Sequence, residues 1–415
     1  MGKLKVLLVL MALMISGCDS IGDDSSTTSE LSPEEVIASD QIEEAIEIIT
    51  INVASFLPDG TQFTQVFLDR VSDFEDEYSY IDVDHYYNAT QTYQVTIEAD
   101  FATGNEPDVI FAPPSGVLDE VLLDEFVSID VIRQQFPSFA GNITTESLDI
   151  AGALTDENYM VPVNGYYKAL YYNKNLFDAY SLGYPNTWEN LMVSVLVFRQ
   201  NDIVPISASF TDTTYYWLEH LLLAVGGDDI YKHSRTEERI MWSDGDEQFQ
   251  RLYTLGAFSP NVVTETYDEA IEEFLTEQSA MIIEGSWLQN EELENWVQMT
   301  TIPYLTGVNN QYIAGFDLGF FVTQAGFNNS KKQSAIIEFI NFMTSDESLT
   351  QFTDVNGGVN PSEHMAQELI STPLLGKETH EWNEIVNTMI DWINTEAIVV
   401  EIEEVVEETR VEVGG

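Results

Sequence analysis

The chain has 415 residues, of which 71 are aspartate or glutamate and 15 are lysine or arginine, so its formal net charge is −56. Because nucleic-acid binding requires cations that neutralise phosphates, this charge excludes nucleic acid as a natural partner. Apolar residues make up 44% of the chain, enough for sizeable cores, and the length is typical of two domains. The charge is spread along the sequence, which indicates a surface exposed to a salty or alkaline medium.

The first 18 residues have the order of a secretory signal. Two lysines precede an apolar run over residues 6–15, which is shorter than the roughly 20 residues that a membrane span needs. The run leads into the letters ISGC, which resemble the lipobox of bacterial lipoproteins, where a diacylglycerol is attached to the cysteine. An ordinary signal with an incidental cysteine is the alternative. We expect Cys18, the only cysteine, to be lipidated and retained, and it leaves no partner for an internal disulfide.

Acidic segments flank the part of the chain that is expected to fold. Residues 19–45 are small, polar and acidic, so they cannot bury a core and predict a flexible tether. Residues 396–415 form an acidic C-terminal tail. The folded part is therefore expected between residues 46 and 395.

The first part of this region alternates between two hydrophobic periodicities. Period-two runs predict strands, and apolar residues three and four apart predict helices. We expect, in order, a strand at 49–53, a helix over 63–74, a strand at 81–84, a helix over 93–101 and a buried strand within 107–114. This order is typical of an α/β domain with a mostly parallel sheet.

The later elements are predicted from the same patterns and from capping residues. They are, in order, a strand at 169–172, a helix capped by Thr187 or Asn186, a helix ending at Gly226, a strand before a turn at Gly285, a strand region over 312–322, two helices separated near Ser345, and a helix over 383–394.

The sequence lacks the common signatures of enzymes and of metal sites. The five histidines are scattered without zinc-site spacing, and the chain has no P-loop, dinucleotide-binding glycine motif or nucleophile-elbow motif. With 71 carboxylates, a pair suited to glycoside hydrolysis carries no information. We therefore predict no catalytic residue, no metal and no cofactor.

Aromatic residues near predicted turns are the feature that points to a ligand. An aromatic face with a few polar neighbours suits a sugar ring, which is apolar on its faces and polar at its edges. Several of these aromatics lie at strand ends, where open α/β sheets bind ligands. The alternative is that they only fill hydrophobic cores.

Four stretches carry a resemblance to a known family. They are VPVNGYYKALYYNKNLF followed by NTWENL, then FLTEQSAMIIEGSW, then IAGFDLGFFVTQAGFNNSKKQSAIIEFINFMTSDES, and last NGGVNPS. In this order, after a lipobox, the chain resembles the family 1 extracellular solute-binding proteins of carbohydrate ABC importers, a group that includes maltose-binding protein.

The resemblance implies an α/β fold with two lobes, the type II periplasmic-binding-protein fold, in which hinge-joined lobes close on a ligand in a cleft. The first lobe is expected to hold 46–165 and 317–358, and the second to hold 168–312 and 362–395. The hinges would fall near Gly165, Ala314-Gly315 and Val359-Asn360.

The resemblance also implies a function and a set of ligand-binding residues. The chain would be a binding protein and not an enzyme: a monomer anchored by its lipid to the outer face of the cell membrane, delivering a sugar or oligosaccharide to the permease subunits of an ABC importer. The expected ligand-binding residues are Ser55, Asp59, Tyr166, Tyr216, Trp217, Trp287, Phe316, Asp317 and Trp382.

Other ligands and other classes of protein remain open. The same fold binds polyamines, which an acidic cleft would suit, and ferric ions, for which GYYKALYYN offers four tyrosines. Strand alternation would place Tyr171 and Tyr172 on opposite faces, which disfavours an iron site. A secreted glycoside hydrolase or a surface adhesin is the alternative from a different class.

Overall fold

The computed structural model describes most of the chain between residues 47 and 371. The described residues are 47–87, 93–114, 122–153, 155, 157–233, 240–288, 293, 295–305, 311–364 and 368–371. Cys18, Trp382, the tether, the tail and the helix predicted over 383–394 lie outside them.

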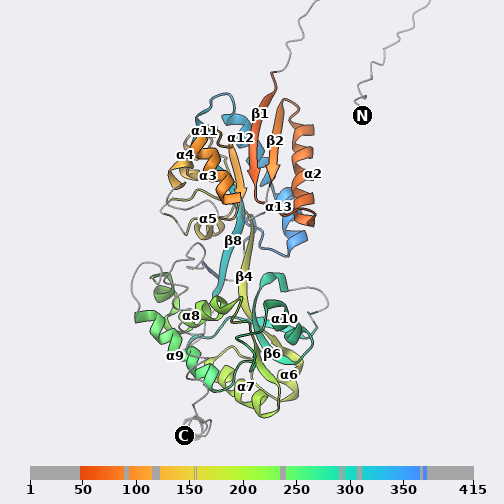
Figure 1. The fold of residues 1–415 in the computed structure, drawn as a ribbon, viewed down its shortest axis with the longest axis vertical. Helices are drawn as coiled ribbons and strands as arrows, with labels where there is room; N and C mark the ends of the chain where they lie inside the picture. The colour runs from red at the N-terminus through yellow and green to blue at the C-terminus, as the bar shows by residue number, and fades with distance from the viewer. Residues whose placement is uncertain are drawn as a thin grey trace, which may run out of the picture. The chain divides into compact units, whose positions relative to one another are not determined.

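The N-terminal part alternates strands and helices, as expected from the sequence (Figure 1). Its elements are β1 (Ile49–Ser55), α2 (Gln62–Glu77), β2 (Ile81–Tyr87), α3 (Tyr93–Thr103), β3 (Val109–Ala112), η2 (Leu123–Glu125), α4 (Ile129–Gln135) and α5 (Thr145–Ala151). Strand β1 pairs in parallel with both β2 and β3. The parallel sheet predicted for this part is therefore confirmed.

The middle of the chain begins with the long strand β4 and continues with a second α/β segment. Its elements are β4 (Val161–Asn173), α6 (Lys174–Ala179), α7 (Trp188–Gln200), β5 (Val204–Ser207), α8 (Thr214–His233), α9 (Ile240–Thr254), α10 (Tyr267–Leu275), β6 (Ser279–Gly285), η3 (Ser286–Leu288) and β7 (Val297–Thr300). Thr187 caps α7, as expected. The helix expected to end at Gly226 is interrupted one residue later, where Gly227 has a φ of 64°.

The chain then returns along a second long strand. The elements of this part are β8 (Gln311–Val322), α11 (Gln324–Asn328), α12 (Gln333–Met343), α13 (Asp346–Asn356) and β9 (Glu368–Ser371). Ser345 separates α12 from α13 and accepts a hydrogen bond from the Ser348 N–H, which starts α13. The break near Ser345 is therefore confirmed.

Strands β4 and β8 form an antiparallel ribbon that joins the two α/β segments (Figure 1). The sheet order is β2-β1-β3-β8-β4-β6-β5, with β7 also paired to β4 and β9 to β8. Strand β3 pairs with the end of β8, whereas β6 pairs with the second half of β4. The fold is therefore a two-lobed α/β architecture on one mixed sheet. Strand β4 starts eight residues before the predicted strand at 169–172.

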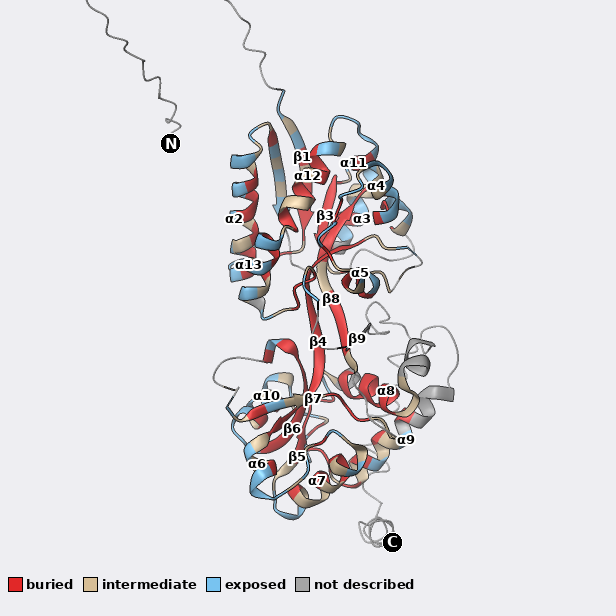
Figure 2. Cartoon of the chain, turned by 180° about the vertical axis from the view of Figure 1, so that it is seen from behind, coloured by how far each residue is buried: buried red, intermediate tan, exposed pale blue. Residues whose placement is uncertain are grey.

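Separate hydrophobic clusters stabilise the two segments. Phe67, Phe111 and Phe339 belong to the cluster of the first segment. Phe198, Trp217 and Phe249 belong to that of the second. Every residue of β4 is buried, and Figure 2 shows this strand in red along its length. Among the described residues, no helix is both long enough and apolar enough to cross a membrane.

Candidate ligand-binding site

The candidate site lies where β5 and β6 end, beside the start of α8 and α10. Tyr216 and Trp217 from α8, Tyr267 from α10 and Glu284 from β6 line a pocket there. Its volume is only about 10 Å³, roughly the space of one water molecule. The pocket is therefore too small for a sugar, and a ligand of that size would have to lie over this face of the second segment.

Trp287 is the exposed aromatic residue of this face. It follows β6 in η3, and 41% of it is exposed. Its indole lies across Gly285, where an added Cβ would come within 2.3 Å of the ring. The Tyr166 ring lies 5.7 Å away at 58°, and the Trp287 Nε1–H donates to the Tyr267 hydroxyl at 3.1 Å. The indole is therefore held in place while part of its surface stays open to a ligand.

A buried ion pair lies behind these aromatic rings. Lys168 Nζ is 2.6 Å from Glu219 Oε2, and the two side chains are 4% and 1% exposed. The ammonium also lies 4.4 Å from the centre of the Tyr216 ring and 5.8 Å from that of Tyr166. Both distances lie in the range of cation–π interactions, so the Lys168 ammonium attracts both tyrosine rings.

Glu284 is the second buried charge-bearing group here. It is 1% exposed, and its Oε1 accepts a hydrogen bond from the Gly285 N–H at 2.7 Å. Burial raises the pKa of Glu284 to about 7, against the opposing effects of the Gly285 N–H and of the Tyr267, Trp287 and Lys168 side chains. The carboxyl group is therefore partly neutral near neutral pH.

Sequence reasoning missed both Lys168–Glu219 and Glu284. The signal was present in part: Lys168 is two residues from Tyr166 on a strand, and Glu219 is three residues from Tyr216 on a helix, so each shares a face with a predicted site residue. Glu284 directly precedes the GSW turn.

The structure brings together three of the predicted site residues: Tyr166 and Tyr216 lie beside the Lys168 ammonium, and Trp287 contacts Tyr166. Trp217 is 2% exposed and packs edge-to-face on Phe258 at 5.1 Å, within the hydrophobic cluster of its segment. Although Trp217 follows Tyr216 in the chain, it makes its ring contacts in the core.

The predicted residues of the first segment lie at the end of β1. Ser55 is fully buried, and its hydroxyl is hydrogen-bonded to His85 Nε2 at 2.7 Å. Burial lowers the pKa of His85 to about 4, so this imidazole is neutral at pH 7. Asp59 is exposed in the turn that follows β1.

Phe316 and Asp317 lie on the ribbon, where the predicted hinge segments meet. Gly165 exchanges two backbone hydrogen bonds with Val359, at 3.1 and 2.7 Å. A Cβ on Gly165 would come within 2.6 Å of the Phe316 ring. Asp317 accepts a hydrogen bond from the Asn164 amide at 3.2 Å, and burial raises its pKa to about 6.

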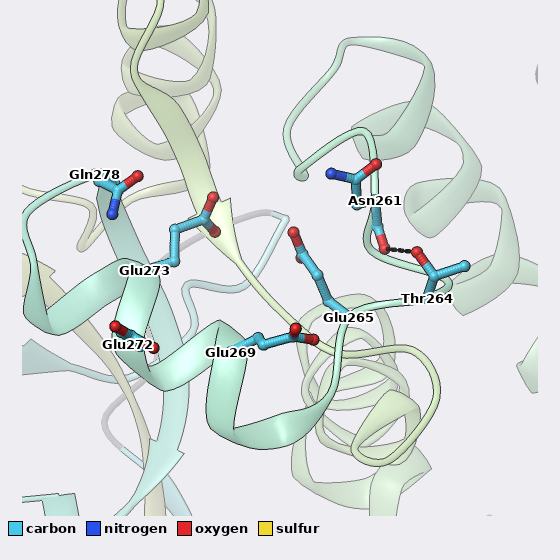
Figure 3. A pocket seen from close by; sticks show the side chains of 7 residues that line it. All are labelled: Asn261, Thr264, Glu265, Glu269, Glu272, Glu273 and Gln278. Atoms are coloured by element: carbon cyan, nitrogen blue, oxygen red, sulfur yellow. Dashed lines mark hydrogen bonds between the residues drawn. The ribbon is translucent and has the colours of Figure 1, made fainter.

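A second pocket, of about 380 Å³, lies on the second segment and is acidic (Figure 3). Its lining residues are Asn261, Thr264, Glu265, Glu269, Glu272, Glu273 and Gln278. None of these residues is aromatic, so the pocket offers no stacking surface for a sugar. Among the described residues, no three His, Cys, Asp or Glu side chains are arranged to hold a metal ion.

Comparison with known proteins agrees with this fold. The profile of the bacterial extracellular solute-binding proteins matches residues 54–349. No curated protein matches the chain.

Three solved structures illustrate the similarity of fold. A secreted solute-binding lipoprotein from Streptomyces coelicolor has a TM-score of 0.67 and 17% identity, over 79% of this chain and 89% of that one. The bacterial solute receptor AcbH, described as preferring β-D-galactopyranose, has a TM-score of 0.66 and 14% identity, over 88% and 98%. RafE, from Streptococcus pneumoniae, in complex with raffinose has a TM-score of 0.57 and 18% identity, over 84% and 95%.

Proposed function

Because the chain belongs to the bacterial extracellular solute-binding protein family, we propose that it captures a sugar or short oligosaccharide and delivers it to the permease of an ABC importer. The observation that carries the proposal is Trp287, an exposed indole held by Gly285, Tyr166 and Tyr267. A fixed, partly open aromatic ring is a stacking surface for a sugar face.

Ligand capture would follow from the hinge-joined lobes proposed from the sequence, 46–165 with 317–358 and 168–312 with 362–395. The sugar would stack on Trp287, beside the predicted Trp382 of the same lobe. It would meet polar groups of the opposite lobe, with Ser55, Asp59 and Asp317 as the predicted contributors. Closure would bend the chain near Gly165, where two predicted hinge segments exchange hydrogen bonds. The lipid on Cys18 would keep this monomer at the outer face of the membrane, near its permease.

The charges at the site favour a neutral ligand over a polyamine. The Lys168 ammonium already occupies the position beside the Tyr216 ring, and a second ammonium there would meet like charge. An iron site is also disfavoured, since Tyr171 and Tyr172 belong to different hydrophobic clusters. The protein would bind without chemistry, so its ligand should be released unchanged.

Calorimetry on the unlipidated Cys18→Ser chain tests the proposal. Raffinose, galactose, xylo-oligosaccharides and chitin oligosaccharides form the first panel, followed by spermidine and ferric citrate, each at low and high salt. We expect saturable heat with one sugar and no new product in the recovered ligand. A response to spermidine or ferric citrate alone would replace the sugar assignment, and hydrolysed sugar would replace the binding assignment.

Trp287→Ala should weaken binding of that sugar by roughly 30-fold, equivalent to about 2 kcal/mol, because it removes the stacking ring. Trp188→Phe is the matched control, since Trp188 lies on α7 and packs against the core of the second segment. An unchanged affinity in Trp287→Ala would show that the ligand binds elsewhere.

A further inference from the structure

Trp287 is exposed, yet its indole N–H is directed inward. Its Nε1–H points to the Tyr267 hydroxyl at 3.1 Å rather than to solvent, while Gly285 supports one face of the ring. A hydrogen bond to a fixed acceptor restricts rotation of the indole in a way that apolar contact alone does not.

Tyr267 is itself held at a rigid position. It is the first residue of α10, which starts with a capping box between Thr266 and Glu269. Its own backbone N–H donates to Asp212 Oδ2 at 2.8 Å. The hydroxyl that accepts the hydrogen bond from the indole N–H therefore belongs to a helix end that is held by the capping box and by Asp212.

Glu284 is the second group that interacts with the same hydroxyl. Glu284 and Tyr267 line one pocket, and each acts on the pKa of the other through a side-chain hydrogen bond. The nearby ammonium, Lys168, is held by Glu219 at 2.6 Å. The Tyr267 hydroxyl can thus accept from Trp287 and donate to Glu284.

We propose that Tyr267 and Glu284 are positioning residues, which form a hydrogen-bond relay that fixes the plane of the Trp287 indole for ligand stacking. The relay depends on the proposed function in one respect, namely that the ligand contacts Trp287. Tyr267 orients the indole, and Glu284 orients the Tyr267 hydroxyl so that its lone pair faces the indole N–H.

The protonation of Glu284 gives the relay a measurable signature. Its pKa of about 7 means that the carboxyl changes charge between pH 6 and 8. Burial lowers the pKa of His220 to about 3, so His220 stays neutral over this range. The other titratable groups that act on the Glu284–Tyr267 pair are Lys168 of β4 and Asp268 of α10. Tyr166 and Tyr216 lie beside the Lys168 ammonium, and Glu219 is paired with it.

The relay is tested first without any ligand, by NMR of the ¹⁵N-labelled tryptophan indoles in the Cys18→Ser chain. The Trp287 resonance is assigned by its loss in Trp287→Phe. We expect its N–H to exchange slowly and its shift to titrate with a midpoint near pH 7. Glu284→Gln should abolish the titration, and Tyr267→Phe should speed exchange at least 10-fold.

Tyr184→Phe is the matched control, because it removes another tyrosine hydroxyl paired with a carboxylate, Asp178, on the same segment. It should leave the Trp287 resonance and its titration unchanged. A Trp287 titration that persists in Glu284→Gln, or slow exchange that persists in Tyr267→Phe, would overturn the relay.

A second measurement connects the relay to binding. With the sugar that binds in the panel above, Tyr267→Phe should weaken affinity about 10-fold at an unchanged thermal midpoint, and wild-type affinity should vary between pH 6 and 8 while that of Glu284→Gln does not. Wild-type affinity in Tyr267→Phe would refute a role in binding. If no sugar binds the wild-type chain, the proposed function fails, whereas the NMR result still decides the relay.

Discussion

At the scale of single residues, Lys168 and Glu219 form an ion pair that is buried in the second segment. The ammonium has one carboxylate partner at 2.6 Å and two aromatic rings within 6 Å. Desolvating both ions is costly, and their attraction offsets this cost only while both are present. We therefore expect the pair to contribute little to net stability, although removal of one partner alone would be costly.

Lys168→Met should lower the free energy of unfolding by about 3–5 kcal/mol, because it leaves the Glu219 carboxylate buried without its partner. The double variant Lys168→Met with Glu219→Leu should recover most of that loss. Urea unfolding followed by circular dichroism measures both. A double variant as unstable as the single one would show that the ion pair itself, rather than the unpaired charge, supplies the stability.

At the scale of elements, the β4–β8 ribbon is the feature on which both segments depend. Its register shifts between Pro162 and Asn164 and again between Asn164 and Gly165. These irregularities lie beside the backbone contact of Gly165 with Val359. A strand that loses its regular register at this point is a natural place for the chain to bend.

Gly165→Ala should destabilise the fold by about 1–3 kcal/mol, because the new methyl group would lie 2.6 Å from the Phe316 ring and 3.0 Å from the Gly315 carbonyl. Phe316→Leu in the same chain should relieve part of the strain. Thermal unfolding measures this, with Gly245→Ala as a control at a glycine where the new Cβ would make only an ordinary contact, 3.5 Å from Leu222. Equal effects in Gly165→Ala with and without Phe316→Leu would contradict the packing argument.

At the scale of the whole molecule, the charge of −56 dominates the behaviour in solution. Repulsion among exposed carboxylates opposes the compact state, and salt shortens its range from about 10 Å at 0.1 M to about 3 Å at 1 M. The hydrophobic clusters of the two segments must hold the fold against this repulsion.

The thermal midpoint should therefore rise by a few degrees as NaCl increases from 0.05 to 1 M, since screening weakens the repulsion. Calorimetric scans in NaCl and in KCl separate screening from effects of a particular cation. A midpoint that falls or stays constant with both salts would show that the surface carboxylates do not limit stability.

Much of the fold was predictable because it depends on local patterns. Alternating residues predicted β1 and β2, and apolar spacing predicted α2 and the pair α12 and α13. The start of β4 was missed, because residues 161–168 are buried on both faces and carry no alternation that distinguishes a strand.

The sequence by itself determined the fold class and the order of most elements, since these depend on periodicity, capping residues and motif order, and it predicted an aromatic site. Only the tertiary structure decided which aromatic faces the solvent, because Trp217 and Trp287 look alike in sequence until packing buries one against Phe258 and leaves the other over Gly285. It also decided that Lys168 meets Glu219, 51 residues away, and that Glu284 and Tyr267 line one pocket. These contacts join distant parts of the chain, and local sequence patterns do not encode them.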